Sequence, residues 1–79
     1  MQVLSPQDGA VVNTPQIEVS GIASAGAVVT VNDNIIVVGA DGQFKTTIAL
    51  GEGPNLIEII ASNDLDSETS VELTVTYEP

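Results

Sequence analysis

Apolar and polar residues alternate with a period of two along most of this 79-residue chain. Because successive side chains of a strand point to opposite faces, such alternation predicts strands with one buried face each. The last of these segments places Val71, Leu73, Val75 and Tyr77 on one face. The other predicted inward sets are Ile17, Val19 and Gly21; Val29 and Val31; Phe44, Thr46, Ile48 and Leu50; and Ile57, Ile59 and Ala61.

A helical reading does not fit these segments. Val, Ile and Thr dominate them, and branching at Cβ favours strands over helices. Gly and Pro recur too often for an amphipathic helix of useful length. We therefore expect no α-helix, or at most one short turn.

Turn-forming residues separate the strands at the intervals that an all-β fold requires. They lie at residues 6–9, 13–15, 24–26, 32–34, 40–42, 51–54 and 63–67. This spacing predicts seven strands, with one further short segment possible at residues 10–12. Seven short strands in about 80 residues indicate a single all-β domain over residues 1–79, built as two packed antiparallel sheets.

The run Ile35-Ile36-Val37-Val38 is continuously apolar and does not alternate. It could be buried on both faces, or it could be an edge strand with one apolar face. As an edge it would invite pairing with another chain. We favour a short, partly covered strand.

The charge balance excludes several classes of function. The chain has eleven acidic residues and only one basic residue, Lys45, so its formal net charge is −10. Such a surface repels nucleic acids and anionic membranes.

The chain has no Cys and no His, which excludes disulfides and zinc sites of the usual kind. No apolar run is long enough to span a bilayer, and no signal peptide is expected, because no basic and apolar leader opens the chain. The first and last residues are expected to be the edges of a module excised from a larger protein.

Several segments together carry a resemblance to a known family. They are Ser5-Pro6 with Asp8-Gly9, and residues 17–21 (IEVSG), 26–32 (GAVVTVN), 41–44 (DGQF), 50–55 (LGEGPN), 57–63 (IEIIASN) and 71–77 (VELTVTY). In order and spacing they resemble bacterial immunoglobulin-like modules of the glucodextranase domain B type. The stretch at residues 63–67 departs from the family, because it lacks the Gly-Asn pair often found before the last strand.

This resemblance implies an immunoglobulin-like antiparallel β-sandwich that works as a non-catalytic accessory module. It would act as a spacer or an interaction and adhesion domain in a secreted or cell-surface bacterial protein. Its partners would be neighbouring domains of the same chain, or a cell-surface polymer or protein. The alternatives are a carbohydrate-binding accessory module of a glycoside hydrolase and a calcium-stabilised surface module.

The residues themselves offer little for catalysis. Without His, Cys or Arg, the usual bases, nucleophiles and oxyanion clamps are scarce, and a sandwich this small has little room for a cleft. We expect no enzymatic activity. An isopeptide crosslink would need Lys45, which alternates with Phe44 and Thr46 and is therefore expected to face solvent.

Calcium is the ligand that the acidic turn best supports, with Asp64 and Asp66 as the expected ligands. Asn63 and Glu68 lie beside them in the sequence, and hard cations prefer such oxygen donors. The order of residues is not that of an EF-hand loop. Acidic turns are also often simply solvated, so no cofactor is required. Asp8 and Asn13 are expected near one end of the sandwich.

Carbohydrate binding usually needs an exposed aromatic ring that stacks on a sugar. The chain has two aromatic residues, Phe44 and Tyr77, and both fit the inward faces of strands. We therefore expect structural roles for both. Asn55 is expected to hydrogen-bond a neighbouring turn, and residues 32–34 to form a tight hairpin turn.

Overall fold

The computed structural model describes residues 1–63 and 68–79, and every regular element in them is a strand. The strands are β1 (Gln2–Ser5), β2 (Val11–Val12), β3 (Gln16–Ile22), β4 (Val28–Val31), β5 (Asn34–Val37), β6 (Gln43–Ala49), β7 (Gly53–Ser62) and β8 (Glu68–Tyr77). The described residues form no helix that could cross a membrane. The all-β prediction is confirmed, and β2 is the short extra segment allowed for at residues 10–12.

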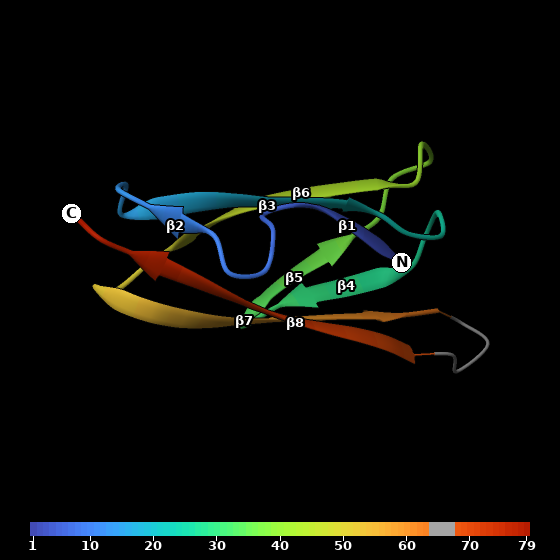
Figure 1. Ribbon diagram of the computed structural model, residues 1–79. Helices are drawn as coiled ribbons and strands as arrows, with labels where there is room; N and C mark the ends of the chain where they lie inside the picture. Colours follow the sequence, from blue (N-terminus) through green and yellow to red (C-terminus); the bar gives the residue numbers. More distant parts are fainter. Residues whose placement is uncertain (64–67) are drawn as a thin grey trace.

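The strands form two sheets that pack face to face as a sandwich (Figure 1). One has the order β1-β3-β6 and the other the order β2-β8-β7-β4-β5. This arrangement confirms the immunoglobulin-like sandwich. The pairs are antiparallel with one exception, since β2 runs parallel to β8. β2 and β8 are distant in the sequence, so no hairpin joins them and no short connection requires them to be antiparallel.

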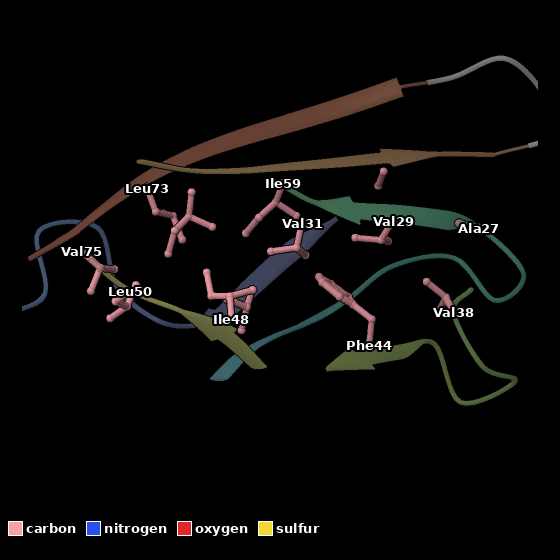
Figure 2. Packing of buried hydrophobic residues seen from close by; sticks show 13 residues of the cluster. Ala27, Val29, Val31, Val38, Phe44, Ile48, Leu50, Ile59, Leu73 and Val75 are labelled. Atoms are coloured by element: carbon pink, nitrogen blue, oxygen red, sulfur yellow. The ribbon is translucent and has the colours of Figure 1, made fainter. Parts of the chain in front are cut away.

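The core lies between the sheets and consists mainly of residues from the predicted inward faces, together with Ala27 and Val38, which those faces did not include (Figure 2). The largest fully buried side chains are Val19, Val29, Val31, Ile57, Ile59 and Val75. Each such side chain contributes about 1.5–3 kcal/mol to stability. Phe44, Ile48, Leu50 and Leu73 are also buried, as predicted. No polar side chain of the described residues is fully buried.

Gly21 sits in β3 directly opposite Phe44 of β6, and this pair sets how closely the smaller sheet packs. A Cβ added at Gly21 would lie 2.5 Å from Cζ of Phe44 and would also overlap the backbone oxygen of Gln2 in β1. The absent side chain therefore leaves room for the aromatic ring and for the approach of β1.

The body is elongated, with extents of 41 × 19 × 18 Å. Its radius of gyration is 12.6 Å, compared with about 11.6 Å for a typical compact domain of this length. The two chain ends lie toward opposite ends of the long axis (Figure 1). Gln2 pairs with Ile22 at one end, whereas Tyr77 pairs with Gly53 at the other.

Candidate functional site

Asp64 and Asp66, the expected calcium ligands, lie outside the described residues. In the described parts of the chain, no group of three or more acidic residues is arranged to hold a metal ion. Asp8 lies beside Thr74, whose backbone nitrogen donates a hydrogen bond of 2.8 Å to its Oδ1. Thr74 is six residues along β8 from Glu68, or about 20 Å in an extended strand. Asp8 is therefore remote from Glu68.

Two carboxylates on neighbouring strands of the larger sheet are both exposed to solvent. Glu58 of β7 and Glu72 of β8 are both exposed and lie directly opposite each other on the outer face of the larger sheet. Neither residue lines the three best-defined depressions of the described surface. A pair of carboxylates that acts on a glycosidic bond needs a site between them that holds the substrate, and these two side chains lie outside those depressions.

One depression in the described surface has charged walls. It has a volume of about 410 Å³, lies over the smaller sheet, and is lined by Glu18, Asp41 and Lys45 together with uncharged residues such as Ser20. Lys45 is exposed, as predicted, and stands opposite Ser20 in the ladder. Its ammonium group is thus on the outer surface and away from the core, which leaves no buried partner for a crosslink.

Neither aromatic side chain provides a platform for a sugar ring. Phe44 is only 3% exposed and packs in the core, and Tyr77 is half-buried against it. The structural roles expected for both residues are confirmed. Since these are the only aromatic residues of the whole chain, no exposed ring is available for stacking.

Two asparagines fix the turns of the larger sheet. Nδ2 of Asn55 lies 2.9 Å from the carbonyl oxygen of Gly51 and 3.0 Å from that of Gly53. It also reaches the carbonyl oxygen of Val75 at 3.2 Å, and its Oδ1 accepts a hydrogen bond from the Gly51 nitrogen. The turn-stabilising role predicted for Asn55 is confirmed, and its amide group is fully used.

Asn32 begins the two-residue turn between β4 and β5 with a φ of 52°, in the left-handed region. Its backbone nitrogen donates to the Glu58 carbonyl oxygen at 2.9 Å, and its Oδ1 accepts from the Glu58 nitrogen at 3.0 Å. The tight turn was predicted from the sequence, because Asn tolerates this conformation. The bond to β7 was missed, since nothing local to residues 32–34 reveals which strand lies beside them.

The apolar run at residues 35–38 places the two most exposed large apolar side chains of the described residues on the surface. Ile35 and Val37 of β5 are 73% and 68% exposed, whereas Val38 is buried. Ile36 is half-buried and packs against the core. β5 is the last strand of its sheet and pairs with β4 on one side. The run is therefore an edge strand with one apolar face toward solvent, which was one of the alternatives left open.

Comparison with known proteins agrees with this architecture. A model of the family described as glucodextranase, domain B, matches residues 1–78. An amylopullulanase from Thermoanaerobacter thermohydrosulfuricus is 36% identical over 78 residues, which cover 94% of this chain and 5% of that protein. The chain thus corresponds to about one twentieth of the length of this relative.

Proposed function

The chain belongs to the glucodextranase domain B family, and from this premise we propose that it is a non-catalytic spacer module in a longer, exported multidomain protein. In this role it would keep the domains before and after it at a fixed separation. The neighbouring domains of the same chain are then its main partners. The match to a small part of a much longer relative supports this assignment.

The placement of the two chain ends carries the proposal. They lie toward opposite ends of a body that is 41 Å long and 19 Å wide. A domain inserted through such ends separates its neighbours along its long axis, whereas a domain with adjacent ends leaves them side by side. The antiparallel ladder between β7 and β8 joins residues from Gly53–Tyr77 to Ser62–Glu68 and runs along much of this axis.

The residue content supports the absence of catalysis. The chain has no His and no Cys, and its one base is the exposed Lys45. The described carboxylates Glu58 and Glu72 are solvated, and neither lines the three best-defined depressions of the described surface. The acidic surface favours solubility in an extracellular setting, because like charges keep copies of the molecule apart.

The match to an amylopullulanase, a protein named for a glycan, suggests carbohydrate binding as the alternative function. The structure favours the spacer over it, because Phe44 is buried and Tyr77 is half-buried. A sugar site would then have to rely mainly on hydrogen bonds, which compete poorly with water.

Two measurements on the purified chain separate the three functions. The first is the release of reducing sugar from starch and pullulan, where a spacer gives only the background rate. The second is electrophoresis through gels that contain starch, dextran or cell-wall polymers, where a spacer migrates as it does in a gel without polymer. Retardation by one polymer would favour the carbohydrate-binding module, and sugar release above background would establish an enzyme.

A further inference from the structure

The edges of the two sheets differ in how well they are protected against pairing with another strand. Natural proteins protect edges with very short strands, bulges, prolines or charged side chains. β1 has a register irregularity between Val3 and Ser5 and is followed by Pro6. β2 has only two residues, and β6 carries Lys45 near its middle.

β5 is the edge strand of the described sheets that has none of these devices. Residues 34–40 (NIIVVGA) contain no charge and no proline. The ladder from β4 to β5 is regular, from Val28 opposite Val37 to Val31 opposite Asn34. β5 contacts β6, but these strands belong to different sheets and no ladder joins them. In an antiparallel edge strand, alternate residues direct their N–H and C=O groups away from the partner strand and can receive another one.

The outer face beside this edge continues the apolar surface into the sheet. The register places Ile35, Thr30 and Ile60 in one row across β5, β4 and β7. The next row holds Val37 and Val28, both exposed. A strand that joins β5 could therefore extend the backbone ladder and cover Ile35 and Val37 with its own side chains.

The charges around β5 indicate what such a strand should carry. Asp33 and Asp41 lie just before and after the uncharged stretch, and both are exposed. Glu58 stands on the same outer face of the sheet. A second copy of this chain would bring a further formal charge of −10 to the contact and would be repelled. A segment with positive charges at both ends meets the opposite sign at each end of β5.

We propose that β5 is a docking edge for an extended peptide segment of a partner protein, with alternating apolar side chains between Lys or Arg residues. The segment adds antiparallel or parallel to β5 as a sixth strand of the larger sheet. This interaction is separate from the spacer role, which depends on the chain ends and not on β5.

The test uses the 79-residue chain and a capped synthetic heptapeptide, Lys-Thr-Val-Thr-Val-Thr-Lys. Amide hydrogen exchange measured by NMR should slow by at least about tenfold at Ile35 and Val37 when peptide is in excess, because these residues alternate with Ile36 and Val38, whose N–H groups are directed toward β4. Two matched peptides serve as controls, one with Glu in place of both Lys residues and one with Pro as the central residue. Each should bind at least about tenfold more weakly, the first through charge and the second through loss of the ladder.

Variants of the chain locate the contact. Ile35→Lys should weaken binding of the basic peptide at least about tenfold, because it removes an apolar contact and adds a like charge. Leu56→Lys is the matched control, since Leu56 is also an exposed apolar residue, at 62%, and lies on β7 away from β5. It makes the same change in net charge and should leave the affinity within about twofold.

Four results would overturn the proposal. The first is absence of binding of the basic peptide at millimolar concentration, and the second is protection at β1 or β6 in place of β5. The third is equal binding of the acidic peptide, which would show that charge does not select the partner. If the chain alone forms a dimer through β5 in sedimentation experiments at physiological salt, the occupant is a second copy and the proposed partner is wrong.

Discussion

Asp8 and Thr74, 66 residues apart in the sequence, are joined by a hydrogen bond of 2.8 Å from the Thr74 backbone nitrogen to Oδ1 of Asp8. The neighbouring Gly9 nitrogen donates to the Thr74 carbonyl oxygen, also at 2.8 Å. Together these bonds attach the loop before β2 to the middle of β8. The Asp-Gly pair thus does more than form a turn, because it satisfies both backbone groups of one residue in a distant strand.

Replacing Asp8 should therefore weaken the fold. Asp8→Ala removes the acceptor for the Thr74 nitrogen and should lower the free energy of unfolding by about 1–2 kcal/mol. Asp8→Asn keeps an oxygen acceptor and should lose less than half of that. Urea unfolding measures both, with Glu52→Ala as a control for the loss of one negative charge. If Asp8→Ala and Glu52→Ala have the same stability, the hydrogen bond makes no net contribution.

A side chain at position 21 should not fit. Gly21→Ala drives a methyl group into the Phe44 ring and toward the Gln2 backbone, and should cost about 1–3 kcal/mol. Gly51→Ala is the matched control, because the atom nearest to its added Cβ is Oδ1 of Asn55 at 3.8 Å. Thermal unfolding followed by circular dichroism compares the two, and equal melting temperatures would mean that the smaller sheet adjusts without strain.

Asn32 stabilises the fold in two ways, by its positive φ in the turn and by its bond to Glu58, and substitutions can separate the two. Asn32→Ala loses both the tolerance of a positive φ and the bond from the Glu58 nitrogen, and should cost about 2–3 kcal/mol. Asn32→Gly restores only the backbone freedom and should cost about 1 kcal/mol, while Asn32→Asp keeps both features and should cost least. Urea unfolding of the three variants checks this order, which a Gly variant as unstable as the Ala variant would contradict.

The faces of the strands could be predicted from the sequence, but the partners of the loops could not. Val29, Val31, Ile57 and Ile59 are buried as predicted, because a period of two directly reports which side of a strand is inward. The run at residues 35–38 is apolar at every position, so alternation could not show which residues face out. Exposure of Ile35 follows from its place on an edge strand, which only the strand order reveals.

The contacts of Asp8 and Asn32 lie beyond sequence reasoning for a similar physical reason. Both join a turn to a strand that is distant in the sequence, at separations of 66 and 26 residues. Local residue types indicate a turn in either case, but they carry no information about what packs beside it. The calcium site expected at Asp64 and Asp66 stays a prediction, because these residues lie outside the described part of the chain.

The facing carboxylates of Glu58 and Glu72 should destabilise the larger sheet at low salt. Like charges directly opposite in a ladder repel, and reversal of one should recover about 0.5 kcal/mol. Glu72→Lys should therefore stabilise the protein more than Glu52→Lys, which changes the net charge equally but lies in a turn. Melting temperatures at low salt and in 1 M NaCl, an ionic strength at which the screening length falls to about 3 Å, test this. A gain that is equal for both variants, or that persists in high salt, would contradict the pairwise repulsion.

The spacer account is tested most directly by the distance between the two ends of the folded chain. Because the protein has no cysteine, Gln2→Cys and Glu78→Cys can be spin-labelled without other substitutions. Pulsed electron paramagnetic resonance should give one narrow distance peak on the scale of the 41 Å long axis, which broadens in urea. A short distance, with both ends on the same side of the body, or a broad distribution in the folded protein would contradict a rigid spacer.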